Sequence, residues 1–209
     1  MIQQADATTP SFRKSENLFA IRTFFIEIPQ ALPILFNESF KNLISTIFGN
    51  NFFIIKSIYF DKPGKSNWFV SYHQDLSISV TNKNKISGFG PWTVKQGYYG
   101  VQPPVSILEN IYTVRIHLDD TDINNGALKI LPKSHLKGVK RLENKINIDN
   151  EVVCEVSKGG IMLMKPLLMH SSSKTTNDKN RRVIHIEFSA DSLPKPLEWA
   201  EKIPLPCPI

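Results

Sequence analysis

The pattern of hydrophobic and polar positions divides the chain into a short helical region and a longer β-rich region. From Phe40 to Phe48, apolar residues recur at i, i+3, i+4, i+7 and i+8, and Gly49 follows as a stop signal. A weaker helical pattern covers residues 31–36. The sequence therefore predicts short helices near the N-terminus, and we find helix signals only in the first quarter of the chain.

After Gly49 the pattern changes to short runs rich in β-branched and aromatic residues, separated by turn sequences such as KPGK, INNG and TTNDKN. Strands without helices between them argue against a parallel α/β sheet. They favour an antiparallel sandwich or a double-stranded β-helix of the jelly-roll or cupin type. The candidate strands are Phe52–Phe60, Trp68–Asp75, Leu76–Val80, Ile111–Leu118, Ala127–Leu131, Val152–Val156, Gly160–Met164 and Arg182–Phe188.

The length of 209 residues fits one domain with a real core. Within it, we expect a helical N-terminal part at residues 1–50 and a mainly β core at residues 51–190. The Pro-rich residues 191–209 are expected to form an extended C-terminal arm.

Composition excludes several classes of protein. Hydrophobic content of 41% and charged content of 21% are typical of a soluble globular domain, and no apolar run reaches the ~20 residues of a membrane span. The net charge is +6, but the lysines are scattered and form no basic stripe, so we expect no nucleic-acid partner. Two cysteines and no signal-peptide pattern favour a cytoplasmic location. The sequence gives no indication of an oligomeric state.

Two polar residues interrupt the apolar run WFVSYHQDLSISV at residues 68–80. On a strand, His73 and Asp75 would point to the same side, where burial costs free energy unless they find a partner. A His-x-Asp pair alone is commonly structural. However, His170 follows another apolar run 97 positions later (170 − 73). Two histidines and one carboxylate match the facial triad that holds Fe(II) and leaves coordination positions open.

Eleven residues after His170, Arg181 opens another predicted strand (181 − 170). An arginine near the third ligand can hold a carboxylate in a two-point, charge-assisted contact, which suggests a 2-oxo acid cosubstrate. Strand alternation puts Arg181, His185 and Glu187 on one face and Arg182 on the other. Arg182 is the alternative for this carboxylate contact.

Other polar residues in the predicted strands allow two interpretations. His185 and Glu187 either contact the substrate or form a hydrogen-bonded core pair. His117, two residues after Arg115, lies on a strand that could line a cavity, and a structural role is the alternative.

Taken together, the segments NWFVSYHQDL, GPWTVKQG, VQPP, TVRIHLDDTDINNGALKILPKSH and MHSSSKTTNDKNRRVIHIEF resemble the phytanoyl-CoA dioxygenase family of Fe(II)/2-oxoglutarate oxygenases. They occur in that family's order and spacing, over roughly residues 52–190. The resemblance implies a double-stranded β-helix with Fe(II), 2-oxoglutarate and O₂ as cofactor and cosubstrates. It implies iron binding by His73, Asp75 and His170, and binding of the distal carboxylate of 2-oxoglutarate by Arg181 with help from Ser172.

Gln74, in the middle of the family's HQD triplet, has three possible roles. It contacts the cosubstrate, orients a ligand, or is an ordinary polar residue on the outer face of the strand. One departure concerns the family's LPGSH turn, where this chain has Lys133 in place of glycine. The change affects the backbone freedom of the turn and no metal ligand.

The implied activity is hydroxylation of an unactivated C–H bond in a small-molecule or acyl substrate, with release of succinate and CO₂. Halogenating relatives replace the carboxylate ligand with a small residue, whereas this chain keeps Asp75. Two other readings stay open. One is a cupin-like metalloenzyme that does not use 2-oxoglutarate, and the other is a non-catalytic jelly-roll binding module.

Overall fold

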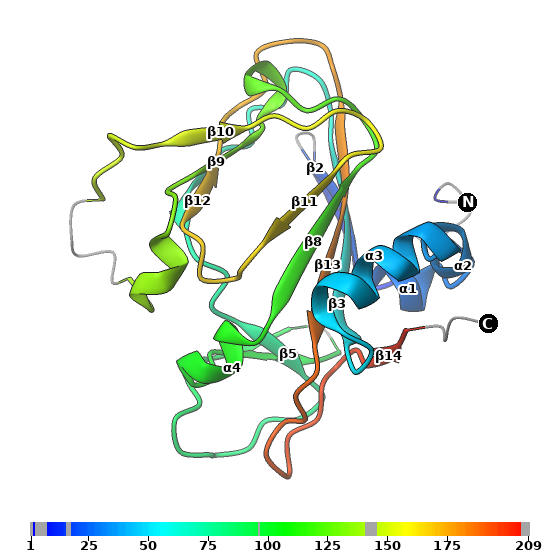
Figure 1. Ribbon diagram of the computed structural model, residues 1–209, viewed down its shortest axis with the longest axis vertical. Helices are drawn as coiled ribbons and strands as arrows, with labels where there is room; N and C mark the ends of the chain where they lie inside the picture. The colour runs from blue at the N-terminus through cyan, green and yellow to red at the C-terminus, as the bar shows by residue number, and fades with distance from the viewer. Residues whose placement is uncertain (1, 3–7, 16–17, 96, 141–145, 206–209) are drawn as a thin grey trace.

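Two β-sheets face each other at the centre of the protein, and the N-terminal helices lie on the outer side of the larger sheet (Figure 1). This computed structural model describes residues 2, 8–15, 18–95, 97–140 and 146–205. Every strand pairing among them is antiparallel. The predicted fold class, a mainly β double-stranded β-helix with short N-terminal helices, is confirmed.

The larger sheet has seven strands in the order β1-β2-β3-β13-β8-β11, with β14 paired to β3. Its centre is the long contact between β3 and β13, which pair from Lys62–Arg181 to Phe53–Ser189. The strands are β1 (Phe12–Ser15), β2 (Leu18–Arg22), β3 (Phe53–Lys62), β8 (Tyr112–His117), β11 (Ile161–Met164), β13 (Arg181–Ser189) and β14 (Ile203–Pro204).

The second sheet has four strands in the order β10-β9-β12-β4, and a third, smaller sheet has the order β5-β7-β6. The four-stranded sheet consists of β4 (Val70–His73), β9 (Leu128–Ile130), β10 (Val152–Cys154) and β12 (His170–Ser172). The three-stranded sheet consists of β5 (Ile78–Val80), β6 (Trp92–Val94) and β7 (Tyr99–Val101).

The predicted helix from Phe40 to Phe48 is confirmed as α3 (Glu38–Phe48). Asn37 caps it, because its side chain accepts a hydrogen bond of 3.0 Å from the Phe40 amide, and Gly49 ends it with φ of 86°. The other helices are α1 (Phe24–Glu27), α2 (Ala31–Leu35), α4 (Val105–Glu109) and the 3₁₀ segments η2 (Ile123–Asn125) and η3 (Ser134–Lys137). The last three lie outside the first quarter of the chain and are too short to show a helical period.

Alternate residues of β13 face the hydrophobic core and the space between the two sheets. Its outward residues Ile184, Ile186 and Phe188 are buried with the phenylalanines of the N-terminal helices in one hydrophobic cluster. Its inward residues include Arg181, which faces the space between the two sheets. The helices thus cover one face of the large sheet and leave the other face free for polar chemistry.

Two regions differ from the prediction. The N-terminal part is not purely helical, because β1 and β2 form a hairpin whose second strand pairs with β3. The C-terminal segment is more than a surface arm: Leu197 and Trp199 are buried in a second core cluster, and β14 pairs with β3. Cys207 lies outside the described residues.

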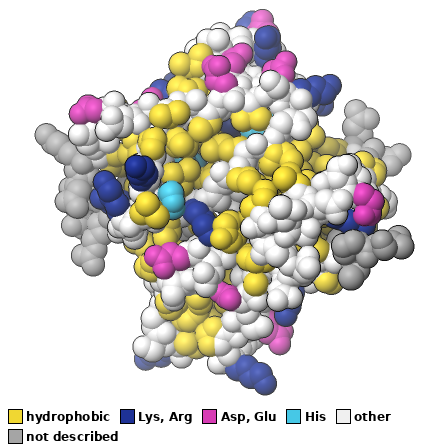
Figure 2. Space-filling view, in the orientation of Figure 1, with side chains coloured by type: hydrophobic (Ala, Val, Ile, Leu, Met, Phe, Trp, Pro, Cys, Tyr) yellow, Lys and Arg dark blue, Asp and Glu magenta, His cyan; other side chains and the backbone are white. Residues whose placement is uncertain are grey.

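Lys133 has a left-handed backbone, with φ of 61°, at the start of η3. Glycine adopts this conformation most easily, so Lys133 holds a backbone conformation that the family's glycine would adopt with less strain. None of the helices in the described part of the chain is long and apolar enough to cross a membrane. On the face seen in Figure 2, Lys and Arg side chains are dispersed among apolar and uncharged ones.

Candidate metal centre

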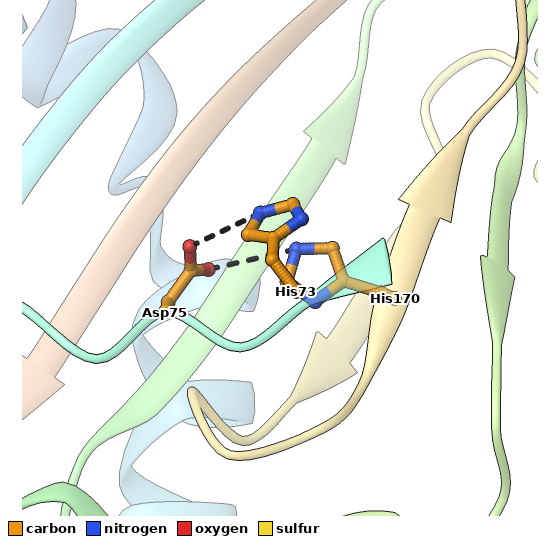
Figure 3. A group of neighbouring side chains, drawn as sticks. All are labelled: His73, Asp75 and His170. Carbon is orange, nitrogen blue, oxygen red and sulfur yellow. Dashed lines mark ion pairs between the residues drawn. The ribbon is translucent and has the colours of Figure 1, made fainter. Parts of the chain in front are cut away.

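His73, Asp75 and His170 come together at one end of the four-stranded sheet (Figure 3). His73 is the last residue of β4 and pairs with His170, the first residue of β12. One ligand atom from each of the three side chains lies within 4.8 Å of the other two. The fold therefore brings together the three side chains that the sequence predicted as metal ligands.

Asp75 reaches this point differently from the prediction. The expected strand Trp68–Asp75 was too long, since β4 ends at His73 and Asp75 lies beyond it. The backbone amide of Asp75 donates a hydrogen bond of 2.9 Å to the Pro166 carbonyl. This bond joins the segment after His73 to the segment before His170, so the cluster depends on a contact between chain segments far apart in sequence.

Both imidazoles present the same nitrogen to the cluster. Nδ1 of His73 lies 2.9 Å from the Ser71 carbonyl, and Nδ1 of His170 lies 2.8 Å from the Leu168 carbonyl. A carbonyl only accepts, so each Nδ1 carries the proton and each Nε2 keeps its lone pair. Each Nε2 lies 3.7 Å from one carboxylate oxygen of Asp75. Three lone-pair donors face a common space, as a metal ion requires.

Electrostatics favours the protonation states that bind a cation. Burial lowers the pKa of His170 to about 4, so this imidazole is neutral at physiological pH. Burial raises the pKa of the Asp75 carboxyl, but its electrostatic interactions with His170, His185, Lys56 and His73 outweigh burial and lower the pKa overall. A neutral imidazole beside an ionised carboxylate is the donor set that suits divalent iron.

The three side chains line a cavity of about 480 Å³ between the sheets. This size is typical of a small-molecule site. All six site residues expected from the sequence line it: His73, Gln74, Asp75, His170, Ser172 and Arg181.

Arg181 and Arg182 have opposite environments. Arg181 is 4% exposed, and its Nε and Nη1 have no hydrogen-bond partner among the described residues. Burial lowers its pKa to about 9. Arg182 points outward and forms an ion pair with Asp119, with Nη2 2.6 Å from Oδ1. Of the two candidates, only Arg181 offers unpaired donors to the cavity.

Ser172 lies two residues after His170 on β12, and its hydroxyl donates a hydrogen bond of 3.0 Å to the Gly126 carbonyl. Gly126 has φ of 85°, and a Cβ there would lie 2.7 Å from the Ser173 carbonyl oxygen and 2.8 Å from Nζ of Lys62. The glycine therefore lets this turn pack closely beneath Ser172.

Gln74 does not lie on an outer face, as one alternative required. It is 8% exposed, and its Nε2 donates to the carbonyls of Leu167 (2.6 Å) and Gly138 (2.9 Å). Its Oε1 accepts from the Lys140 amide at 2.8 Å. The bond to Leu167 ties the His73–Asp75 segment to the segment before His170, and the other two tie it to the loop after η3. The contacts favour the interpretation that Gln74 orients the ligands.

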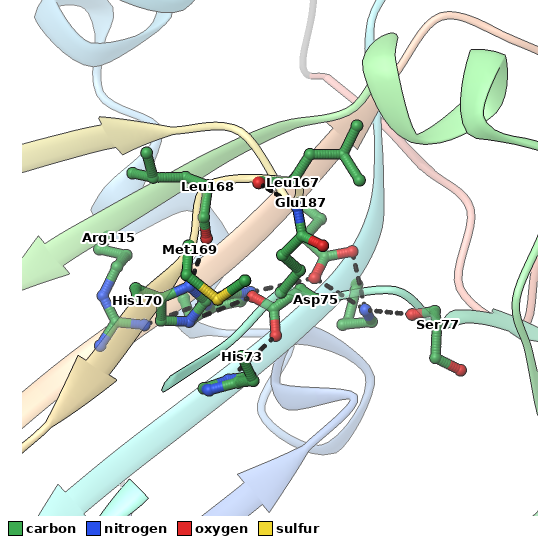
Figure 4. Close-up of polar contacts among 12 residues, drawn as sticks. His73, Asp75, Ser77, Arg115, Leu167, Leu168, Met169, His170 and Glu187 are labelled. Carbon is green, nitrogen blue, oxygen red and sulfur yellow. Dashed lines mark hydrogen bonds and ion pairs between the residues drawn. The ribbon is translucent and has the colours of Figure 1, made fainter. Parts of the chain in front are cut away.

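A chain of buried polar side chains runs along the inner face of the large sheet (Figure 4). Nη1 of Arg115 lies 3.1 Å from Nδ1 of His185, and Nε2 of His185 lies 3.1 Å from Oε1 of Glu187. Lys56 completes the chain, with Nζ 2.7 Å from the same carboxylate. His185 and Glu187 are therefore hydrogen-bonded to each other and also line the cavity.

The sequence reasoning missed Lys56 and Lys62. Both lie on β3 with the parity of Ile58 and Phe60, so they face the same side of the strand, and Lys56 lines the cavity. Lys62 is fully buried, its Nζ donates to the Ser173 carbonyl, and burial lowers its pKa to about 7. Two lysines that share the strand face of the apolar residues Ile58 and Phe60 are the signal that could have revealed them.

One protein family matches most of the chain. The family model described as phytanoyl-CoA dioxygenase (PhyH) matches residues 4–183. No curated protein sequence matches the chain.

Solved structures with this fold include metal-dependent enzymes. A non-haem monooxygenase, ThoJ in its apo form, has a TM-score of 0.62 at 17% identity, covering 81% of this chain and 58% of ThoJ. EctD from S. alaskensis with bound Fe has a TM-score of 0.61 at 17% identity, covering 85% and 59%.

HygX from Streptomyces hygroscopicus, with nickel, 2-oxoglutarate and hygromycin B bound, has a TM-score of 0.59 at 12% identity. The match covers 90% of this chain and 74% of HygX. At these identities the likeness establishes the fold. The chain spans less than two thirds of the length of ThoJ and EctD.

Proposed function

Since the chain belongs to the phytanoyl-CoA dioxygenase family, we propose that it is a non-haem Fe(II)/2-oxoglutarate-dependent dioxygenase that hydroxylates an unactivated C–H bond of a small-molecule or acyl substrate. One observation carries the proposal. The donor atoms of His73, Asp75 and His170 converge within 4.8 Å in a cavity that also holds the unpaired, buried guanidinium of Arg181.

The donor set fits iron(II). Two imidazole nitrogens with free lone pairs and one ionised carboxylate are the facial triad of non-haem iron oxygenases. Bound iron(II) with 2-oxoglutarate and O₂ supplies oxidative decarboxylation coupled to C–H hydroxylation, giving succinate and CO₂. The protein residues provide position and environment for that chemistry.

Each residue has a distinct task in this proposal. His73, Asp75 and His170 would hold the metal from one side, because His73 and His170 are paired at one end of the four-stranded sheet and Asp75 lies just beyond His73. Arg181 would hold the distal carboxylate of 2-oxoglutarate through a two-point contact, with the Ser172 hydroxyl beside it. The rest of the 480 Å³ cavity would receive the substrate and keep water away from the metal.

Arg181 separates this function from that of a cupin-like metalloenzyme without 2-oxoglutarate. Two unpaired donors on a buried guanidinium are costly unless an anion satisfies them. A metal-dependent isomerase or hydrolase has no need of such a group, whereas a dicarboxylic cosubstrate does. The intact donor set likewise argues against a non-catalytic binding module.

The test removes the ligands one at a time. Asp75→Ala and His170→Ala should each abolish succinate release in the presence of Fe(II), ascorbate and 2-oxoglutarate. Both should weaken nickel binding in calorimetry and leave the β-rich circular dichroism unchanged. Asp178→Ala is the matched control, since that carboxylate is exposed and pairs with exposed Lys65. Full succinate release by both ligand variants would refute the assignment.

A further inference from the structure

Two guanidinium groups, not one, are buried in the same cavity. Arg115 on β8 is 7% exposed and lines the cavity together with Arg181. Nε of Arg115 has no hydrogen-bond partner among the described residues, as is also true of Nε and Nη1 of Arg181. One carboxylate at Arg181 would leave the unpaired donor of Arg115 unexplained.

Arg115 on β8 pairs in register with His185 on β13, four residues after Arg181 on that strand (185 − 181). Both arginines line the cavity together with the metal ligand His170, and the charge of Arg115 lowers the pKa of Arg181. Figure 4 shows the Arg115 side chain next to His170. It is therefore close to the end of the cavity where the metal-binding atoms of the cosubstrate would lie.

The orientation of Arg115 is fixed before any ligand binds. A guanidinium only donates, so Nδ1 of His185 accepts from Arg115 and Nε2 of His185 donates to Glu187. Lys56 in turn holds Glu187 with contacts of 2.7 and 2.8 Å. This chain occupies Nη1 of Arg115 and leaves Nε available.

We propose that Arg115 binds the metal-side carboxylate of 2-oxoglutarate, so that the cosubstrate lies between two guanidiniums, one for each of its carboxylates. This inference rests on the proposed function and extends it. The charges match: Lys56 is paired with Glu187 and the buried Lys62 amine donates to the Ser173 carbonyl, which leaves Arg115 and Arg181 as two buried guanidiniums with unpaired donors for a dianion. Neutralising both on binding removes the cost of keeping them unpaired.

The test uses two ligands that share the 2-oxo acid end. 2-Oxoglutarate carries a distal carboxylate, and 2-oxopentanoate has a methyl group in its place. Their affinities for nickel-loaded protein are measured by calorimetry in Arg115→Gln, Arg181→Gln and the control Arg182→Gln. Arg182 is a suitable control because it is the same residue type on the outer face of β13, paired with Asp119.

Arg115→Gln should weaken both ligands by a similar factor of roughly 10 to 100. Arg181→Gln should weaken 2-oxoglutarate by a comparable factor and leave 2-oxopentanoate unchanged. Arg182→Gln should change neither affinity. Arg115→Lys keeps the charge without the planar fork and should fall between wild type and Arg115→Gln. It also tests the proposal if the glutamine variant does not fold.

Several results would overturn this assignment. An Arg115→Gln variant with normal affinity for both ligands shows that the residue contacts neither. A loss confined to 2-oxoglutarate moves Arg115 to the distal carboxylate. Wild-type protein that binds 2-oxoglutarate but no 2-oxopentanoate has no independent site for the 2-oxo acid end. Wild-type protein that binds neither compound contradicts the proposed function itself.

Discussion

The C-terminal segment contains a buried carboxyl group whose protonation should set the pH dependence of stability. Glu201 is 2% exposed, and its Oε2 accepts a hydrogen bond of 2.7 Å from the Ser57 amide, while Oε1 accepts from the Ser57 hydroxyl. Burial raises its pKa from 4.5 to about 7, despite these hydrogen bonds. The folded protein therefore holds this proton at a pH where the unfolded chain has lost it.

The sign follows from proton linkage. Below pH 4.5 the carboxyl is protonated in both states and stability is unaffected. As pH rises towards 7, the unfolded chain ionises first, so the free energy of unfolding falls and the loss is complete above the folded-state pKa. At about 1.36 kcal/mol per pKa unit, the full loss is about 3 kcal/mol, most of it between pH 5 and pH 8.

Glu201→Gln removes the titration and keeps the shape. Gln replaces one acceptor oxygen with a donor, so the variant should carry a constant penalty of about 1 kcal/mol. Relative to wild type, its free energy of unfolding should then rise by about 2.5 kcal/mol between pH 5 and pH 8. Urea titrations followed by circular dichroism measure this difference. Glu198→Gln, on the same segment but exposed, is the control. A difference from wild type that does not vary with pH would show that the folded-state pKa of Glu201 is normal.

Three further substitutions test the inner wall of the cavity. Lys56→Met leaves the buried Glu187 carboxylate without its cation and should lower the free energy of unfolding by about 3–5 kcal/mol in urea titrations. The control Lys65→Met removes an exposed ion pair and should change the free energy of unfolding by less than about 0.5 kcal/mol. Gln74→Leu loses three hydrogen bonds to the backbone and should cost about 3 kcal/mol. It should also weaken nickel binding in calorimetry, and unchanged metal affinity would contradict its role as a ligand-orienting residue. Gly126→Ala places a Cβ against a carbonyl oxygen at a residue with positive φ, so the free energy of unfolding should fall by about 2 kcal/mol in a thermal melt. An unchanged free energy of unfolding would disprove the close packing.

Local sequence patterns were sufficient for much of the fold. The apolar period from Phe40 to Phe48 gave α3, because a helix is defined by contacts within one segment. Alternation on the strand after Arg181 correctly separated inward from outward residues, since the period of two follows from strand geometry. The two arginines could be told apart by this alternation and family spacing, and their different environments agree with it.

Other features escaped local patterns. The hairpin β1–β2 and the strand β14 form because β2 and β14 add to the edge of β3 opposite β13, and no local window contains that partner. Asp75 lies past the end of its strand and is held by the distant Pro166 carbonyl. The burial of Glu201 likewise depends on Ser57, far away in the sequence.

By itself, the sequence determined which residue types were available for a metal and a dicarboxylic acid, and the spacing of His73, Asp75, His170 and Arg181. Only the tertiary structure decided that these groups share one cavity with Arg115, and which donors there remain unpaired. The physical reason is the distance along the chain over which each effect acts. Backbone periodicity acts over a few residues, whereas the pairing state of a buried charge depends on every strand that folds around it.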